Sequence, residues 1–198
     1  MTKRLRQNIL ETALFVRQCL SKPQQMGAIA PSSRGLAKAM ARWVTEDPLA
    51  VVFELGPGTG SITRALVERG LAGDRLLAIE KCPEMSVVLQ KRFPGVRVIN
   101  GDAWDLEGLM ERHVDPAHHV GAVISSLPLR RFTPEATEAL ARKIRAVLRP
   151  GGYWVQYSYH LGNDRPLGTG YFHLRTSSVV WLNLPPARVS VYQKPLPN

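Results

Sequence analysis

The sequence predicts an α/β fold, in which a mainly parallel sheet carries helices on both faces. Short apolar strand patterns alternate with helical patterns along the chain, which is typical of parallel sheets. An apolar run at 49–53 leads into a glycine-rich turn at 54–60, and a helical pattern follows at once. With 198 residues, 44% of them hydrophobic, the chain is long enough for one well-buried domain over 1–198.

In chain order, the first expected element is a helix over 4–21. Ser32 and Ser33 can cap a second helix, whose apolar face includes Leu36, Ala37 and Met40. We expect these elements to form a helical cap over 1–45, with the core over 48–198. The core strands are expected near 50–55, 75–80, 96–99, 120–125 and 152–158. The helices between them are expected near 61–69, 84–92, 105–112 and 134–147. A closing hairpin of strands at 177–182 and 188–192 spans two prolines.

The composition points to an anionic partner. Lys and Arg number 26 against 16 Asp and Glu, a formal net charge of +10, which suits nucleic acid or an anionic membrane surface. Cys19 and Cys82 provide neither a disulfide framework nor zinc-ligand spacing. No apolar run is long enough to span a bilayer, and the first 22 residues lack signal-peptide features. We therefore expect a cytosolic protein that can attach to a surface, with no metal site.

The glycine turn predicts a nucleotide-type site, because ligands of open α/β sheets bind at the carboxyl ends of strands. Gly56, Gly58 and Gly60 let the backbone approach a ligand closely. Their spacing differs from a dinucleotide fingerprint, and the P-loop lysine is missing. Glu54 is unsuited to a phosphate but suits a cation. These features favour S-adenosylmethionine (SAM), whose methionyl end carries an ammonium and a sulfonium.

Two more acids follow neighbouring strands. Glu80 ends the second strand and could hold two ribose hydroxyls, whereas Asp102 follows the third strand and could accept from the adenine amino group. Each acid taken alone is more often a solvated loop residue, but three strand-end acids beside one glycine turn favour a site. This order resembles the class I SAM-dependent methyltransferases over residues 48 to 160. The resemblance implies a Rossmann-like, mainly parallel seven-stranded sheet with a C-terminal antiparallel hairpin and an N-terminal helical cap.

The segment after the fourth strand, Ser125-Ser-Leu-Pro-Leu-Arg130, bears on the acceptor. Enzymes that methylate an adenine amine carry Asn/Asp-Pro-Pro-Tyr/Phe here. Serine stands in place of the Asn or Asp, and Leu129 in place of the aromatic ring that stacks on the base. Stacking contributes about 1–3 kcal/mol per base, so its loss argues against base methylation. An ordinary strand-to-helix loop explains Ser125 equally well.

After the fifth strand comes Tyr157-Ser-Tyr-His160. Aromatic rings near a methylated nitrogen can stabilise an ammonium by cation–π contact, about 0.5–2 kcal/mol each. Tyr157 and Tyr159 should point to the same side of the strand, although Tyr157 could simply belong to the core. Tyr159 or His160 could accept a proton from the amine. We take Tyr159, His160 and Ser126 as the candidate catalytic residues.

The helix over 4–21 is amphipathic and basic. Its apolar face includes Leu5, Ile9 and Val16, and Glu11 is the single acid within the first 22 residues. The basic side chains there are Lys3, Arg4, Arg6, Arg17 and Lys22. Such a helix can lie in the interface of an anionic membrane, or it can pack over an active site. Both alternatives stay open.

Several segments together resemble the small soluble bacterial phospholipid N-methyltransferases. They are Phe15-Val-Arg17, Gln25 to Ala37, the glycine turn, Ser126-Leu-Pro128 and Trp181-Leu-Asn-Leu-Pro-Pro-Ala187. The resemblance implies methylation of phosphatidylethanolamine and its methylated intermediates towards phosphatidylcholine, peripherally at the cytoplasmic membrane and without stable nucleic-acid binding. It also implies a SAM site, with S-adenosyl-L-homocysteine as product, to which we assign Glu54, Gly56, Gly58, Gly60, Glu80, Lys81, Asp102, Ala103 and Ser125.

Cations that could meet a lipid phosphate are Lys38, Arg42, Arg130 and Arg131, although surface solvation explains most of them. Two rival functions remain. An rRNA adenine N6-dimethyltransferase-like enzyme would share the fold and the basic charge, and a SAM-fold protein could act only as a lipid or RNA binding module.

Overall fold

The computed structural model describes residues 32–197, except 72, 163–166 and 168–169. The helix expected over 4–21 lies outside the described residues, and so does Cys19. None of the helices that can be described has the length and apolar character needed to cross a membrane.

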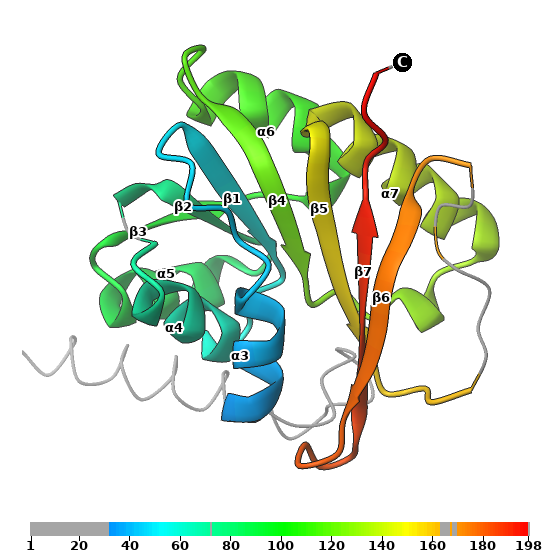
Figure 1. Cartoon of the computed structure of the whole chain (residues 1–198). Helices are drawn as coiled ribbons and strands as arrows, with labels where there is room; N and C mark the ends of the chain where they lie inside the picture. Colours follow the sequence, from blue (N-terminus) through cyan, green and yellow to red (C-terminus); the bar gives the residue numbers. More distant parts are fainter. Residues whose placement is uncertain (1–31, 72, 163–166, 168–169, 198) are drawn as a thin grey trace, which may run out of the picture.

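A seven-stranded sheet with the order β3-β2-β1-β4-β5-β7-β6 forms the centre of the molecule (Figure 1). β1 to β5 pair in parallel, whereas β7 is antiparallel to both β5 and β6. This arrangement confirms the predicted mainly parallel sheet with a closing hairpin. The strands are β1 (Ala50–Leu55), β2 (Gly73–Glu80), β3 (Val96–Asn100), β4 (His119–Ser125), β5 (Leu148–Ser158), β6 (His173–Val180) and β7 (Ala187–Gln193).

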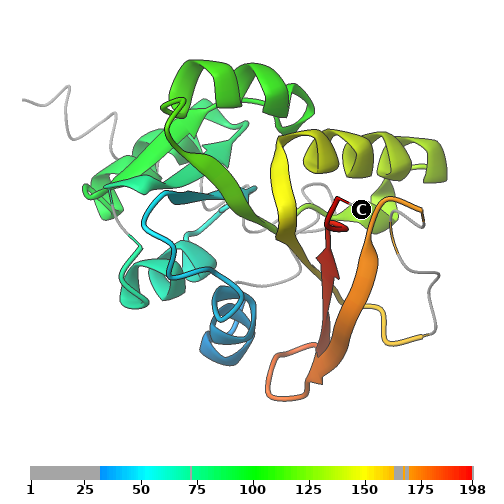
Figure 2. The same ribbon diagram turned by 45° about the horizontal axis from the view of Figure 1, so that its top comes forward.

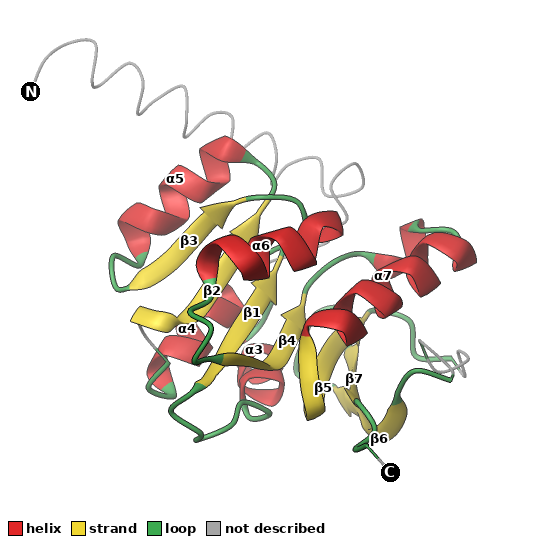
Figure 3. Cartoon of the chain, turned by 90° about the horizontal axis from the view of Figure 1, so that it is seen from above, coloured by secondary structure: helices red, strands yellow, loops and turns green. Residues whose placement is uncertain are grey.

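Helices cover both faces of the sheet (Figures 2 and 3). On one face lie α3 (Arg34–Ala41), α4 (Ser61–Glu68) and α5 (Pro83–Arg92), and on the other lie α6 (Leu106–His113) and α7 (Pro134–Val147). Because alternate residues of a strand point to opposite faces, Val52 belongs to the first core and Phe53 to the second. Two short 3₁₀ turns, Ala103–Asp105 and Leu129–Arg131, follow β3 and β4.

Local chemistry sets the helix starts. Ser33 caps α3 by accepting a hydrogen bond from the Leu36 N–H, as its position in the sequence predicts. Thr133 caps α7 in the same way, with a proline at the first helical position.

β5 and β6 differ most from their predicted bounds. β5 begins at Leu148, because that residue pairs with Val120 before Gly151 turns the chain in the left-handed region at φ 75°. The first hairpin strand, predicted over 177–182, begins at His173 and ends at Val180. Trp181 and Leu182 extend the apolar pattern in the sequence, but they leave the ladder and enter the connection to β7.

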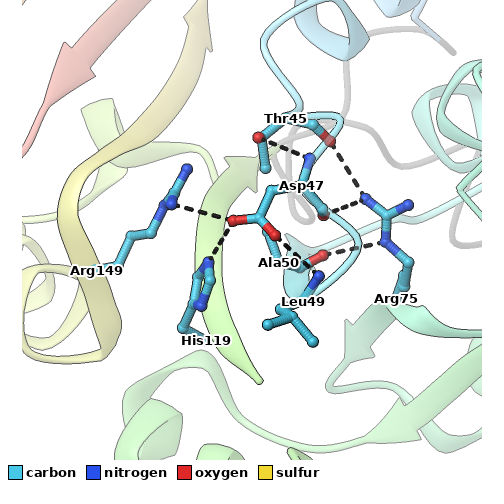
Figure 4. A network of polar contacts seen from close by, with 7 residues as sticks. All are labelled: Thr45, Asp47, Leu49, Ala50, Arg75, His119 and Arg149. Atoms are coloured by element: carbon cyan, nitrogen blue, oxygen red, sulfur yellow. Dashed lines mark hydrogen bonds and ion pairs between the residues drawn. The ribbon is translucent and has the colours of Figure 1, made fainter. Parts of the chain in front are cut away.

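The amino ends of the strands are joined by the carboxylate of Asp47, which lies in the loop before β1 (Figure 4). It accepts from the Leu49 N–H at 3.0 Å, and its Oδ2 lies 3.1 Å from His119 Nε2 and 3.2 Å from Arg149 Nη1. His119 starts β4 and Arg149 is in β5, so this acid connects three parts of the sheet edge.

Arg75 of β2 completes the network in Figure 4. Its guanidinium donates to the carbonyl oxygens of Thr45, Asp47 and Ala50 at 2.9–3.3 Å. The entry into β1 is therefore held by two charged side chains: Asp47 binds the Leu49 N–H, and Arg75 binds carbonyl oxygens of the same loop.

We predict that Asp47→Asn destabilises the protein at neutral pH. The hydrogen bond from the Leu49 N–H lowers the pKa of Asp47, and the charges of His119 and Arg149 lower it further. Burial opposes them by raising the pKa, but the net result lies below the usual value of 3.8. The carboxylate therefore contributes stability above pH 3.8, and that contribution is lost as the pH falls through the depressed pKa.

Urea unfolding at a series of pH values measures the difference between the wild type and Asp47→Asn, which should shrink on acidification. Asp74→Asn, at an exposed position of β2, is the matched control and should show little effect. A difference between wild type and Asp47→Asn that is constant with pH would contradict the prediction.

Candidate functional site

The glycine turn connects β1 to α4 at the carboxyl edge of the sheet. Gly56, Gly58 and Gly60 all have positive φ values, 65°, 55° and 79°, which residues with a Cβ rarely adopt. The Gly56 N–H donates to the carbonyl of Ile79 at 3.0 Å, so the turn crosses over the end of β2.

The three glycines have different surroundings. A Cβ on Gly56 would lie 3.2 Å from Leu127 Cδ2, whereas one on Gly58 would meet only the Gly56 carbonyl, at 3.9 Å. A Cβ on Gly60 would lie 2.4 Å from the Phe93 ring. Gly60 is therefore needed for packing of α4 against α5, while Gly58 is the glycine with open space for a ligand.

Glu54 is a fully buried carboxyl group one residue before the end of β1. Neither of its oxygens has a hydrogen-bond partner among the described residues, and the Thr63 hydroxyl lacks one as well. Burial raises the pKa of Glu54 to about 8, against the lowering effect of the nearby Thr63 hydroxyl and N–H. A buried carboxylate is costly unless it is paired, so this site suits a cation such as the ammonium of SAM.

Glu80 is half-buried at the end of β2, and it ties the glycine turn to the next loop. Its Oε2 accepts from the Gly58 N–H at 3.2 Å and its Oε1 from the Cys82 N–H at 3.0 Å. A carboxylate offers about four lone-pair sites, so both oxygens can still accept from vicinal ribose hydroxyls. The role predicted for Glu80 fits this geometry.

Asp102 and Lys81 form an ion pair, with 2.8 Å between Lys81 Nζ and Asp102 Oδ2. Partial burial raises the pKa of Asp102, but hydrogen bonds from Lys81 and from the Trp104 N–H, with the Lys81 charge, hold it below its usual value. Asp102 thus binds Lys81 and the Trp104 N–H, two partners that were not predicted from the sequence. The pair is largely exposed, and such pairs contribute about 0–1 kcal/mol, so it can open to a ligand. The adjacent Ala103 is buried.

The loop after β4 is held by its own backbone. Ser125 is buried, and its hydroxyl accepts from the Leu127 N–H at 3.3 Å, while the Ser126 N–H donates to the Leu55 carbonyl at 2.9 Å. Leu129 is buried in the core. These contacts support the alternative in which Ser125 is part of an ordinary strand-to-helix loop.

Gln156 was not assigned to the site from the sequence. Its signal is a polar side chain within the otherwise apolar strand segment Trp154-Val-Gln156, which indicates a buried hydrogen-bonding role. It is buried, and its Nε2 donates to the Leu127 carbonyl at 3.0 Å and to the Tyr157 carbonyl at 2.8 Å. The side chain therefore connects the ends of β4 and β5.

Tyr157 and Tyr159 lie side by side at the end of β5, as predicted from their spacing. Their rings are edge to face with centroids 5.4 Å apart, and both pack against the core beneath α3. Burial, and then the neighbouring Tyr159, raise the pKa of Tyr157, which therefore stays a neutral phenol. The His160 N–H donates to the Ser158 hydroxyl, and the imidazole faces Gly162. Ser126, Tyr159 and His160 thus follow strands at the same sheet edge as Glu54 and Glu80.

The sheet order, the glycine turn and the acids of β1 and β2 together define the class I methyltransferase architecture. Comparison with known proteins agrees: a family model described as a methyltransferase domain matches residues 52–152. The chain belongs to the class I SAM-dependent methyltransferases, and S-adenosyl-L-methionine is its cofactor.

Among its relatives is an ornithine lipid N-methyltransferase of Singulisphaera acidiphila, 31% identical over 147 residues, which are 72% of this chain and 75% of that protein. A ribosomal RNA small subunit methyltransferase A of Phenylobacterium zucineum is 36% identical over 102 residues, but these are 50% of this chain and 33% of that protein. The structure of the N-methyltransferase NodS from Bradyrhizobium japonicum WM9, in complex with S-adenosyl-L-homocysteine, has a TM-score of 0.64 at 14% identity and covers 93% of this chain and 98% of that one.

We predict that SAM binding releases a proton from Glu54. Below about pH 7 the ligand ammonium stays protonated, whereas the carboxyl, with its pKa of about 8, must first ionise. Titration calorimetry from about pH 5.5 to 7 should show affinity rising by up to about tenfold per pH unit, with heats that depend on the buffer.

Glu54→Gln should bind more weakly and without this pH slope. The unliganded wild type should also lose stability relative to Glu54→Gln as the pH rises from 4.5 towards 8, because the native state disfavours ionisation. Identical pH slopes in the two proteins would contradict the assignment.

We predict that Glu80→Gln reduces SAM affinity by weakening ribose recognition. Loss of charge-assisted hydrogen bonds should cost about 1.5–3 kcal/mol. S-adenosyl-L-homocysteine and its 2′,3′-dideoxy analogue provide the test by calorimetry, since wild type should discriminate strongly between them and the variant little.

Glu84→Gln, at an exposed acid on the neighbouring α5, is the control and should discriminate like wild type. If Glu80→Gln weakens both ligands equally, the residue acts only by holding the turn through Gly58 and Cys82.

Proposed function

We propose that this enzyme transfers methyl groups from SAM to the amine of a membrane-lipid headgroup. The substrate that we propose is phosphatidylethanolamine, with its methylated intermediates, at the inner surface of the cytoplasmic membrane. The observation that carries the proposal is the similarity to an ornithine lipid N-methyltransferase, which extends over 72% of this chain and 75% of that relative. Lipid amines are therefore the first acceptors to test.

The edge that holds the SAM residues also offers groups suited to such an acceptor. The Tyr157–Tyr159 pair lies at the carboxyl end of β5, and rings of this kind favour an ammonium by about 0.5–2 kcal/mol each. The SAM sulfonium supplies an electrophilic methyl group. The acceptor amine must be neutral before it attacks, and we assign Tyr159 and His160 to the region that receives its proton. Alignment of donor and acceptor then lowers the barrier.

Exposed cations lie on elements next to that edge. α3 carries Arg34 and Lys38 one turn apart, and Arg42 caps its C-terminal end. None of residues 34–42 is acidic. This row of positive charge, together with Arg130 and Arg131 after β4, suits the phosphate of a phospholipid and an anionic surface.

RNA methylation is the second candidate, because the net charge is +10 and part of the chain is similar to an rRNA methyltransferase. The loop after β4 argues against it. Leu129 is buried where an aromatic ring would stack on a base, and the Ser125 hydroxyl is engaged with the Leu127 N–H. The lipid proposal needs neither a stacking ring nor an amide at these positions.

We predict that purified enzyme with tritiated SAM labels lipid and leaves RNA unlabelled. Separate reactions should contain anionic vesicles with phosphatidylethanolamine, the same vesicles with ornithine lipid, or total RNA, and chromatography should resolve mono-, di- and trimethylated products. Glu54→Gln is the inactive control. Label in ornithine lipid alone would support lipid N-methylation but show that the headgroup is not phosphatidylethanolamine. Label in RNA alone would overturn the proposal.

Tyr159→Ala should lower lipid turnover by about tenfold, since one cation–π contact contributes about 0.5–2 kcal/mol, and Tyr159→Phe should retain most of it if the ring alone matters. If Phe is as defective as Ala, the hydroxyl takes part in proton transfer.

A further inference from the structure

The connection between β6 and β7, residues 181–186, has an inside-out distribution of side chains, and we call it the hairpin tip. Trp181, Leu182 and Leu184 are 69%, 92% and 82% exposed, whereas the polar Asn183 between them is 1% exposed. Loops usually show the opposite pattern, with polar residues outward. Three large apolar side chains in water at one turn indicate a surface that they contact.

Hydrogen bonds hold the hairpin tip in this arrangement. Asn183 Oδ1 accepts from the Ser33 N–H at 2.9 Å, and Asn183 Nδ2 donates to the Pro185 carbonyl at 2.7 Å. The Asn183 N–H donates to the Val180 carbonyl. The amide thus anchors the tip to the start of α3, so the outward direction of its apolar neighbours is built in.

The topology places the hairpin tip at the edge that holds the SAM site. β6 and β5 are both antiparallel to β7, so β6 runs in the same direction as the parallel strands and ends at their carboxyl edge. Figure 1 shows the β6–β7 connection extending beyond the ends of β1 and β4. The start of α3, with exposed Arg34, is adjacent through the Ser33–Asn183 contact.

We propose that the hairpin tip inserts into the interface of an anionic lipid bilayer and turns the active-site edge towards its substrate. This inference rests on the proposed function. A turn of six residues is too small for a stable protein interface, which needs about 800 Å² per partner. Tryptophan prefers the headgroup region, leucines enter the acyl boundary, and a neighbouring cation pairs with anionic headgroups.

The main test uses flotation of the full chain with vesicles of phosphatidylethanolamine and phosphatidylglycerol. Leu182→Ser and Leu184→Ser should each lower the partition coefficient about tenfold, which corresponds to about 1.4 kcal/mol. Leu196→Ser is the matched control, because Leu196 is 71% exposed and lies beside Gly151, at the opposite edge of the sheet. Circular dichroism and SAM binding should be unchanged in all three. Equal flotation of tip and control variants would overturn the proposal.

Fluorescence locates the tip directly. Vesicles with brominated acyl chains should quench wild type more strongly than Trp181→Phe, and without vesicles acrylamide should reach Trp181. Protection from acrylamide in vesicle-free protein would show that the chain itself, or a second copy, covers the tip, and this result would overturn the proposal.

A separate measurement distinguishes failure of this inference from failure of the proposed function. With short-chain phosphatidylethanolamine below its micelle concentration, Leu182→Ser should methylate as fast as wild type, and it should be slow only on vesicles. Equal losses on both substrates would assign the leucine a structural role and overturn the inference. Vesicle binding through the tip without methylation of either substrate would support the inference and refute the proposed function.

Discussion

The crossing of the glycine turn over β2 is the constraint on which the site depends. The Gly56 N–H is bound to the Ile79 carbonyl, and the Gly58 N–H to the Glu80 carboxylate. Both bonds require a backbone that turns in the left-handed region directly after β1, which glycine does without strain. With the turn fixed there, α4 starts beside α5, and Glu54 of β1 and Glu80 of β2 lie next to the turn at the carboxyl edge, where we predict that they bind SAM.

Stability and function are divided between the two edges of the sheet. At the amino edge, the Asp47 carboxylate pairs with His119 and Arg149, and Arg75 donates to the carbonyl oxygen of Asp47. At the carboxyl edge, Glu54 is buried without a partner among the described residues, and its pKa is raised to about 8. An unpaired buried acid opposes folding, so the surrounding apolar sheet must offset it. Placing the polar network at the far edge leaves the ligand edge available for a cation.

Local patterns in the sequence were enough to predict the turn, the order of elements and the acids, because each depends on neighbours along the chain. Local patterns could not show that Lys81 forms an ion pair with Asp102 or that Gln156 connects the ends of β4 and β5, since these contacts depend on tertiary packing. Gly60 illustrates the same limit. Its spacing is that of a ligand-binding glycine, but the Phe93 ring beside it gives it a packing role.

The hairpin also shows why an apolar pattern can mislead. Trp181 and Leu182 extend the strand-like run of β6, and period alone assigns them to the sheet. Asn183 decides otherwise, because its buried amide binds the start of α3 and forces the chain to turn. Inserting β7 between β5 and β6 makes β6 run with the parallel strands, so the turn that follows must emerge at the ligand edge. The strand order thus brings the hairpin tip and the glycine turn to the same edge of the sheet, which is the arrangement that the proposed action on a lipid headgroup would require.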